Sequence, residues 1–269
     1  MSVAPQPMSF VECRFGDFSG FVRKGFDTPE LFSFLSEMEG RIKEIEKRHY
    51  DPFRFLKPTD RMVTVVDIPF AGGVEKAVLK QDDFLRDFNL VKFLKYAFKR
   101  SRGQRAWLSA NAMADVGLSV PLPIAYMERR RFGFFLKGYL FMEYIDGANS
   151  LVHALGAGGA RLLAKVARAV RELHDSGFFH GDLKPSNMLV REEGGEPRVY
   201  FIDLEDMRMV GAVNVSMRTR DLIRLLEDIS VVDSGYPSIV LSAYSAERGD
   251  DASDTAASEA VECFQRVDG

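Results

Sequence analysis

The chain has 269 residues, of which 46% are hydrophobic and 28% charged, and its formal net charge is -3 at pH 7. This composition is ordinary for a globular protein with one large domain or two small lobes, and the weak negative charge argues against binding nucleic acid over the whole surface. No apolar run approaches the roughly 18–20 residues that a membrane helix needs.

The first half of the chain favours strands, with one or two helices among them. SFVECRFGDFSGFVRK predicts two short strands joined at Gly16–Gly20, and a helix follows in which Thr28 is the cap and Pro29 the first residue. RMVTVVDIP and VEKAVLKQ predict a hairpin whose turn is Ala71-Gly72-Gly73. WLSANAMADVG predicts a helix that stops at Gly117, and GYLFMEYIDG predicts an apolar strand that ends in an acidic turn.

The second half favours helices and one small hairpin. Apolar residues recur at helical spacing from Gly158 to Asp175, and Gly177 follows as a C-cap. NMLV and RVYFID, separated by the polar turn REEGGEP, predict the hairpin, and SMRTRDLIRLLEDI predicts another helix. The last twenty or so residues predict one amphipathic helix. We therefore expect two lobes joined near Met142–Gly147.

The cysteines and the first residues bear on the compartment. Cys13 and Cys263 stand near opposite ends of the chain and form neither a metal-ligand spacing nor a disulfide framework. MSVAPQPMSF lacks the charged start and apolar core of a signal peptide. We therefore expect a protein of the reducing cytoplasm.

The loop HGDLKPSNMLV concentrates polar side chains between apolar flanks. Pairing NMLV with VYFID brings Asn187 and Asp203 to one edge of the hairpin, and an amide oxygen beside a carboxylate suits Mg²⁺. Asp182 can accept a proton from an attacking hydroxyl, and Lys184 can place positive charge near a transferring phosphate. These are the working parts of phosphoryl transfer. The alternative reading is a hydrogen-bonded turn with two strand-end caps.

Several motifs resemble protein kinases. HGDLKPSN resembles their catalytic loop H-R-D-L-K-P-x-N, with Gly181 in place of the arginine. FID with Leu204 and Glu205 resembles the metal-binding D-F-G segment, with its second and third positions changed. AVLK resembles the strand motif V-A-I-K, and YLFMEYIDG is similar to the hinge between kinase lobes. The resemblance implies that Lys80 contacts the α- and β-phosphates of ATP and that the backbone of Glu143 and Ile145 binds adenine.

The chain is more specifically similar to the bacterial lipopolysaccharide core kinases, which phosphorylate Kdo or heptose sugars of the lipid A–core. No A-P-E follows the metal-binding segment, and too few residues remain for a full protein-kinase C-lobe. The pattern AVLKQ…SRGQRAW…ANAMADVGLSVPLPIAY…GYLFMEYIDGA…HGDLKPSNMLV…YFIDLED carries the similarity. It covers most of Phe55 to Leu226 and is specific between Ser101 and Pro123.

This resemblance implies an α+β, two-lobed, protein-kinase-like fold with a β-rich N-lobe at 1–142, a hinge at 143–147 and a mainly helical, shortened C-lobe at 148–269. It implies an ATP-dependent kinase whose acceptor is a sugar hydroxyl of a lipid-linked core oligosaccharide, with Mg²⁺ as cofactor. One alternative is a compact atypical protein kinase or a small-molecule kinase of the same fold. An alternative of another class is a nucleotide-binding pseudokinase that acts as a scaffold.

Two departures from the kinase pattern concern the nucleotide. LKPTDRMV stands where a glycine-rich loop is expected, and Ala106 stands near the position of the helix glutamate that pairs with the strand lysine. Asn111, an acid elsewhere or a direct contact with Asp203 are the candidate replacements for that partner of Lys80.

Other residues carry open alternatives. His180 is read as a brace for the loop backbone, and Glu205 either adds to the metal site or caps a turn. The stretch 86–105 has seven lysines and arginines against one acid, with aromatic residues interleaved. It is either an amphipathic helix packed on the N-lobe or a contact for an anionic membrane surface. In the second case the protein is peripheral on the inner face of the cytoplasmic membrane; no nucleic-acid partner is expected.

Overall fold

The computed structural model describes residues 10–48, 61–70, 72–84, 99–246 and 255–262. The chain divides into two compact units: residues up to Asn111 together with Leu122–Tyr144 form the first, and Ala112–Pro121 together with the residues from Ile145 form the second. The segment 112–121, which the sequence placed in the N-lobe range, lies in the second unit. Two hydrogen bonds to Ser119 hold it there, because its carbonyl accepts the Phe201 N–H at 3.0 Å and its hydroxyl accepts from Arg198 Nε at 2.9 Å.

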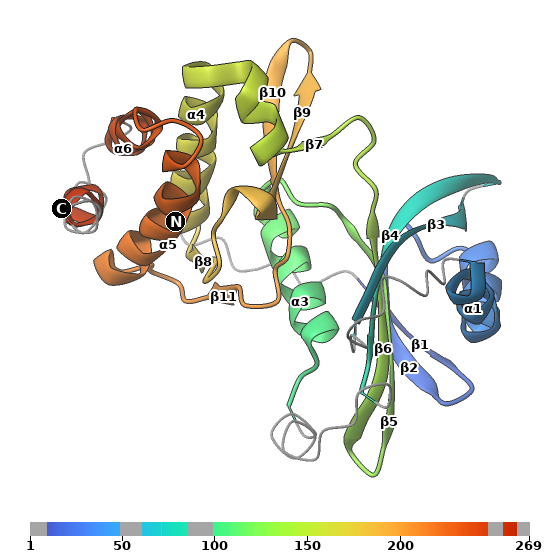
Figure 1. Cartoon of the computed structure of the whole chain (residues 1–269). Helices are drawn as coiled ribbons and strands as arrows, with labels where there is room; N and C mark the ends of the chain where they lie inside the picture. The colour runs from blue at the N-terminus through green and yellow to red at the C-terminus, as the bar shows by residue number, and fades with distance from the viewer. Residues whose placement is uncertain (1–9, 49–60, 71, 85–98, 247–254, 263–269) are drawn as a thin grey trace. The chain divides into compact units, whose positions relative to one another are not determined.

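The first unit is built on one antiparallel sheet of six strands in the order β1-β2-β5-β6-β4-β3 (Figure 1). The strands are β1 (Phe10–Phe15), β2 (Phe18–Arg23), β3 (Arg61–Phe70), β4 (Gly73–Asp83), β5 (Pro123–Arg131) and β6 (Phe134–Glu143). The helices are α1 (Pro29–Arg48) and α3 (Arg102–Asp115), of which the last four residues belong to the second unit. The capped helix and the two hairpins expected here are confirmed, but the first turn is shorter than the expected Gly16–Gly20, because Gly20 lies within β2 and pairs with Cys13.

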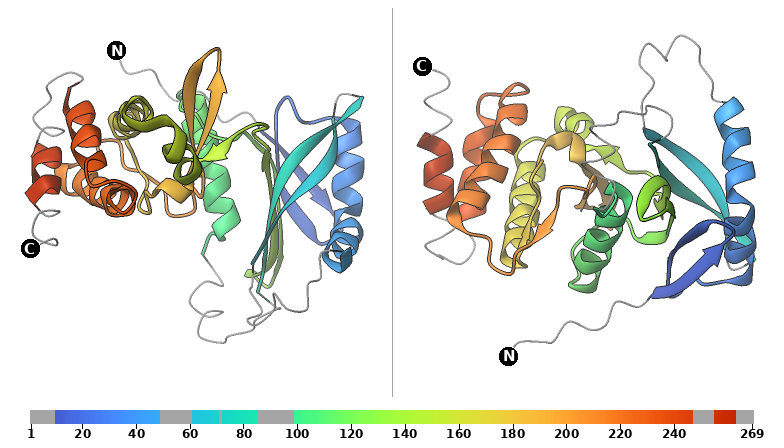
Figure 2. Two further views of the ribbon diagram at one scale, coloured as in Figure 1. Left: turned by 45° about the horizontal axis from the view of Figure 1, so that its top comes forward. Right: turned by 90° about the horizontal axis from the view of Figure 1, so that it is seen from below.

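Helix α1 covers one face of this sheet and forms the core with it (Figure 2). Its apolar stripe packs against inward-facing side chains of the strands, among them Ala77 and Leu79 of β4. The stripe consists of Leu31, Phe34, Leu35, Met38 and Ile42. Because side chains alternate across a strand, the pattern that buries Ala77 and Leu79 places Lys80 on the face opposite α1.

The second unit is mainly helical. Its helices are α4 (Leu151–Asp175), α5 (Val215–Ser230), α6 (Tyr236–Ser245) and a further helix at 255–262. Its strands are β7 (Asn149–Ser150), β8 (Phe178–Phe179), β9 (Met188–Glu193), β10 (Glu196–Phe201) and β11 (Arg208–Met209), with the 3₁₀ turn η1 (Pro185–Asn187) before β9. The expected hairpin is β9–β10, and β8 pairs with β11 in a second small sheet.

Two helices of the second unit differ from expectation. Helix α4 begins at Leu151, since the Ser150 side chain accepts the His153 N–H as an N-cap, and its backbone is non-helical at Gly159. The apolar periodicity from Gly158 therefore marks only the part after this kink. Helix α6 was not predicted, because YPSIVLSAYS has no charged side chain to mark a solvent face. No helix of the described residues is long and apolar enough to cross a membrane.

Candidate active site

The loop between β8 and β9 carries the candidate catalytic residues, and they lie together. The Lys184 Nζ is 2.8 Å from Asp182 Oδ2, and Asn187 Nδ2 donates to the same carboxylate at 3.1 Å and to the Asp182 carbonyl at 2.9 Å. Arg224 of α5 approaches the other carboxylate oxygen at 3.6 Å. Lys184 in the first place, and also Asn187 and Arg224, hold the pKa of Asp182 below its usual value. The carboxylate is therefore ionised at neutral pH, as a proton acceptor must be.

A carboxylate of α5 holds the backbone of this loop through hydrogen bonds. The Asp221 side chain is buried and accepts the N–H groups of His180 at 2.8 Å and Gly181 at 2.9 Å. His174 Nε2 of α4 lies 3.3 Å from Asp221 Oδ2. Three groups thus contact one buried carboxylate, which satisfies it and holds the residue before Asp182 in place.

Sequence reasoning missed Asp221, because an aspartate within a helix is usually solvated. The available signal was its position: it directly precedes Leu222 on the side of α5 that also carries Leu225 and Leu226, all buried. A carboxylate on a buried helix side needs donors from elsewhere in the fold.

The hydrogen bonds of Asp221 continue to α6 through His174 and Tyr244. His174 Nδ1 lies 2.8 Å from Tyr244 Oη, and Arg218 donates to the same oxygen at 3.2 Å and to Asp175 Oδ1 at 2.8 Å. Burial lowers the pKa of His174. A neutral His174 with its proton on Nε2 donates to Asp221 and accepts from Tyr244, which fits both contacts.

Gly181 has a steric reason to be glycine. Its φ is +82°, and a Cβ there would stand 3.0 Å from the carbonyl oxygen of Asp206. The arginine found at this position in protein kinases would meet both obstacles in this backbone. The glycine in place of the H-R-D arginine is therefore explained by the local backbone conformation of this loop.

His180 is fully buried, and neither ring nitrogen makes a hydrogen bond of ordinary geometry with the described residues. Burial lowers the pKa of its imidazole, so the ring is neutral at pH 7. Its ring packs near that of Phe201, with 6.3 Å between the centroids. A buried, neutral ring does not suit a proton carrier, whereas the expected bracing of the loop backbone stays a prediction, since the ring nitrogens make no ordinary hydrogen bond with the described residues.

Asn187 and Asp203 meet at one end of the β9–β10 pair. Met188 is paired with Phe201, and one step further the Ile202 N–H donates to the Asn187 carbonyl at 2.9 Å. Asp203 follows with φ +62°, one of two non-glycine residues at positive φ in the described chain. Such strain often accompanies function, although aspartate tolerates it better than most residues.

The residues at this end fit a magnesium ion. Asn187 uses its amide nitrogen toward Asp182, which leaves its amide oxygen for a cation, and Asp203 supplies a carboxylate. No group of three or more His, Cys, Asp or Glu side chains is placed to hold a metal within the described part of the chain. Magnesium needs no such group, because it takes one or two protein oxygens and completes its shell with water and phosphate.

The candidate nucleotide residues of the first unit are placed by the sheet. Lys80 is paired with Val63 of β3 and Leu140 of β6. Asn111, one candidate partner of Lys80, is engaged elsewhere: its side-chain Oδ1 accepts from Arg23 Nη1, and its Nδ2 donates to the Trp107 backbone carbonyl at 2.8 Å. The segment expected to replace the glycine-rich loop lies mostly outside the described residues.

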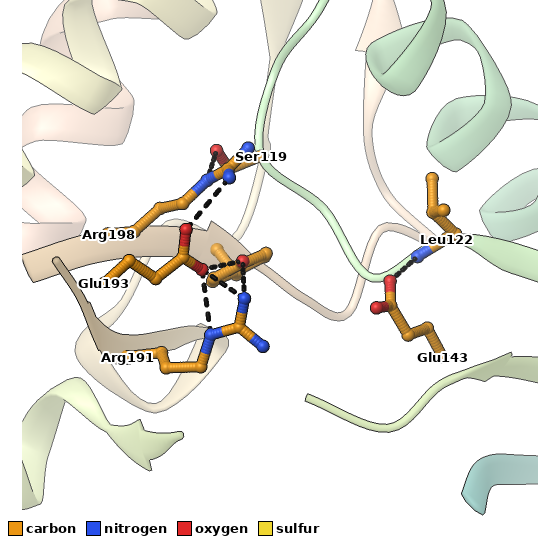
Figure 3. Close-up of polar contacts among 7 residues, drawn as sticks. Ser119, Leu122, Glu143, Arg191, Glu193 and Arg198 are labelled. Carbon is orange, nitrogen blue, oxygen red and sulfur yellow. Dashed lines mark hydrogen bonds and ion pairs between the residues drawn. The ribbon is translucent and has the colours of Figure 1, made fainter. Parts of the chain in front are cut away.

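Glu143 at the end of β6 fixes the segment before β5 (Figure 3). Its N–H donates to the Leu122 carbonyl at 2.8 Å, and its Oε2 accepts the Leu122 N–H at 3.0 Å. The sequence predicted only a backbone role for Glu143, so the hydrogen bond made by its side chain is an addition. In the second unit, the Ile145 carbonyl accepts the Ala148 N–H at 3.3 Å.

A second polar cluster in Figure 3 stiffens the β9–β10 hairpin. Glu193 accepts from Tyr200 Oη at 2.6 Å and from Arg198 Nη1 at 3.1 Å, and it also pairs with Arg191. These donors, Tyr200 first, lower the pKa of Glu193 to about 2. The hairpin that carries Asn187 at one end is thus braced at the other.

Comparisons with known proteins agree with this geometry. The model of the lipopolysaccharide kinase (Kdo/WaaP) family matches residues 88–243, more than half of the chain. A 3-deoxy-D-manno-octulosonic acid kinase from Mannheimia succiniciproducens is 28% identical over 119 residues, 41% of this chain and 48% of that protein. The serine/threonine-protein kinase PknJ of Mycobacterium tuberculosis is 30% identical over 147 residues, 52% of this chain and 25% of that protein.

Among solved structures, WaaP in complex with acyl carrier protein aligns over 77% of this chain and 87% of that chain, with a TM-score of 0.51 and 17% identity. This likeness shows the protein-kinase-like fold, with its β-rich first unit and shortened helical second unit. The matches to the two curated relatives span between a quarter and about half of their length.

Proposed function

Because the chain belongs to the lipopolysaccharide kinase (Kdo/WaaP) family, we propose that it transfers the γ-phosphoryl group of ATP to a sugar hydroxyl of the lipopolysaccharide inner core, on Kdo or heptose. The observation that carries the proposal is that Lys184 and Asn187 each lie within 3.1 Å of the Asp182 carboxylate. The backbone just before Asp182 is held by Asp221. This arrangement supports phosphoryl transfer, in which positioning and charge neutralisation do most of the work.

In the proposed reaction, the acceptor hydroxyl oxygen forms a bond to the γ-phosphorus while the bond from that phosphorus to the β,γ-bridging oxygen breaks, and ADP leaves. Asp182 orients the hydroxyl and takes its proton. Lys184 adds positive charge beside the transferring group. Asn187 and Asp203 would hold Mg²⁺, which when bound would neutralise charge on the phosphate oxygens.

The first unit supplies the nucleotide contacts in this proposal. Lys80 contacts the α- and β-phosphates, on the sheet face that α1 leaves uncovered. The backbone of Glu143 and Ile145 binds adenine. Of these two residues, the Glu143 side chain is already committed to the Leu122 N–H, so it is a support of the segment and not a nucleotide ligand.

The test is transfer from labelled ATP to defined core oligosaccharides, followed by mass spectrometry of each acceptor. The proposal expects a gain of one phosphate on an acceptor that ends in Kdo or heptose, and none with a neutral hexose. Phosphate on protein but on no sugar would favour a compact protein kinase. Nucleotide binding without transfer to any acceptor would favour a pseudokinase scaffold.

We further propose that the protein reaches its lipid-linked acceptor by contact with the anionic inner face of the cytoplasmic membrane. Much of the basic stretch 86–105 lies outside the described residues. The described part begins at Lys99, whose carbonyl accepts from Arg130 Nη2 of the β5–β6 hairpin at 3.0 Å. At the tip, Phe132 is 84% exposed at φ +53°, and the Arg131 Cζ lies 5.5 Å from its ring centre. An exposed aromatic ring among cations suits the interface of a bilayer.

A further inference from the structure

Two arginines share one aromatic ring beside the catalytic loop. The Arg208 Cζ lies 4.9 Å from the centre of the Phe179 ring, and the Arg220 Cζ lies 5.7 Å from the same centre. Phe179 is buried and belongs to β8, which pairs with β11 so that Arg208 stands directly opposite it (Figure 1). Arg220 comes from α5. Strand pairing and helix packing therefore bring the two cations together from segments that are apart in the chain.

These two arginines lack the counter-charges that other arginines of the second unit have. Arg218 pairs with Asp175, Arg198 with Glu193 and Arg161 with Glu196. Arg208 and Arg220 are both exposed, and neither forms an ion pair with a carboxylate in the part of the chain that the structure describes. Two like charges held near one ring repel each other, and an anion bound between them removes that repulsion.

The chain and helix α5 both connect the two arginines to the candidate base Asp182. Phe179 comes three residues before Asp182, with only His180 and Gly181 between them. Arg220 and Arg224 lie four residues apart on α5 and so share a helix face, and Arg224 already reaches the Asp182 carboxylate at 3.6 Å. Positive charge therefore continues along one side of the second unit up to the candidate catalytic carboxylate.

We infer that Arg208 and Arg220 bind an anionic group of the acceptor, a sugar carboxylate or a phosphate, and so orient its hydroxyl toward Asp182. The inference rests on the proposed function and names the acceptor class of the same site. Guanidinium groups suit this role because their donors match carboxylate and phosphate oxygens in pairs. Stacking on Phe179 holds them in place without using those donors.

The test compares the wild type with the double variant Arg208→Gln, Arg220→Gln. With an acceptor that ends in Kdo, the KM for acceptor should rise roughly 10- to 100-fold, as for the loss of hydrogen bonds to a charged group. The kcat and the KM for ATP should stay within a few-fold. The double variant Arg161→Gln, Arg168→Gln removes the same charge from exposed positions of α4 and should leave all three constants unchanged.

Acceptor chemistry separates the two anions. If the arginines bind the carboxylate, esterifying the Kdo carboxylate should raise the KM for acceptor of the wild type but not that of the Arg208, Arg220 variant. If they bind a phosphate, removing the phosphates of the acceptor should have this selective effect instead. The inference is wrong if the variant keeps the wild-type KM for every acceptor, or if neither acceptor change distinguishes the proteins.

Binding without turnover provides an independent readout. Protein with Asp182→Asn should bind the anionic acceptor in calorimetry, and adding the two glutamines should reduce that affinity by the same factor as the KM. A wild type that transfers phosphate to no sugar would contradict the proposed function, whereas a wild type that transfers with an indifferent variant contradicts only this inference.

Discussion

Asp182 lies among positively charged side chains, and this limits how strong the proposed base can be. Lys184, Arg224 and the Asn187 amide all favour its ionised form, so its pKa is lowered and its intrinsic basicity is weak. A weak base is adequate here, because a loose phosphoryl-transfer transition state demands little proton removal before the phosphorus–oxygen bond breaks. Orientation of the hydroxyl is then its larger contribution.

Asp182→Asn should reduce transfer by roughly 10²–10⁴-fold, since the amide cannot take a proton although it keeps the shape of the side chain. Nucleotide binding should survive, as measured by calorimetry. Asp17→Asn, at an exposed turn of the first unit, is the matched control and should leave transfer unchanged. Transfer by Asp182→Asn within a few-fold of wild type contradicts the role.

The pH dependence of transfer should reflect the pKa of Asp182, which the neighbouring cations lower. The base form exists above the pKa of Asp182, so kcat/KM should stay level to a lower pH than an isolated carboxylate allows. Lys184→Met removes the leading cause of the depression and should move the acidic limb of the profile to higher pH. Arg224→Gln removes a lesser cause and should move it less. An acidic limb at the same pH in all three proteins means that Asp182 is not the titrating base.

Asp203→Ala should abolish the increase in ATP affinity that Mg²⁺ produces, and Asn187→Ala should reduce it less. A carboxylate neutralises metal charge, whereas an amide only contributes a ligand. Calorimetry of ATP with and without Mg²⁺ measures both effects. Equal enhancement in wild type and Asp203→Ala would remove Asp203 from the metal site.

At the scale of elements, the catalytic loop depends on α5. The Asp221 carboxylate meets the backbone of the loop and the side chain of α4, so three segments share one buried charge. Removing the carboxylate would leave its three donors buried without a hydrogen-bond acceptor.

Asp221→Ala should lower the free energy of unfolding by about 2–4 kcal/mol, because it leaves two backbone N–H groups and His174 unsatisfied in a buried place. Asp221→Asn keeps one acceptor oxygen and should cost less. Urea denaturation measures the stability, and transfer should fall in both variants. Glu227→Ala, an exposed carboxylate on the same helix, should change stability by less than about 1 kcal/mol. If Asp221→Ala is as stable as that control, the loop is held by other contacts.

The difference between Asp182 and Asp221 marks how far the sequence could predict this site. Asp182, Lys184 and Asn187 lie in one local motif, and the pairing of β9 with β10 follows from a short turn, so their meeting was predictable. Asp221 is some 40 residues away, and only the packing of α5 under the loop turns an ordinary helix aspartate into an anchor. Arg208 and Arg220 were missed for the same reason, since β8–β11 pairing and α5 bring them to Phe179. Helices with a clear polar face, such as α1, were predicted, whereas the charge-free α6 was not.

At the scale of the whole molecule, the proposed lipid-linked acceptor requires the protein to reach a membrane surface. No described helix can cross a membrane, so the proposed contact rests on exposed groups of the first unit. Lys99, Arg100 and Arg102 are exposed, as are Arg131 and Phe132 at the hairpin tip, and the four cations form no ion pair within the described residues.

Changing these four cations to glutamine should weaken binding to vesicles of anionic lipid at least tenfold, since each basic residue near such a surface contributes roughly 1 kcal/mol. Phe132→Ser should weaken binding further, and added salt should weaken the wild type. Val231→Ser, at an 86% exposed apolar side chain of the second unit, is the control for loss of any exposed apolar group. Unchanged vesicle binding in the combined variant would show that this surface does not meet the membrane. Transfer to a delipidated acceptor should be unaffected.

The burial of Asp221 also sets how the catalytic loop exchanges its amide hydrogens. The N–H groups of His180 and Gly181 point at a carboxylate that is 1% exposed, so solvent reaches them only when α5 separates from the loop. Exchange at these two amides then requires the same opening that exposes the core around Leu222 and Leu225, rather than the small fluctuations that expose an ordinary surface loop. The backbone at His180 and Gly181, directly before Asp182, should therefore stay in place for as long as α5 stays packed against it.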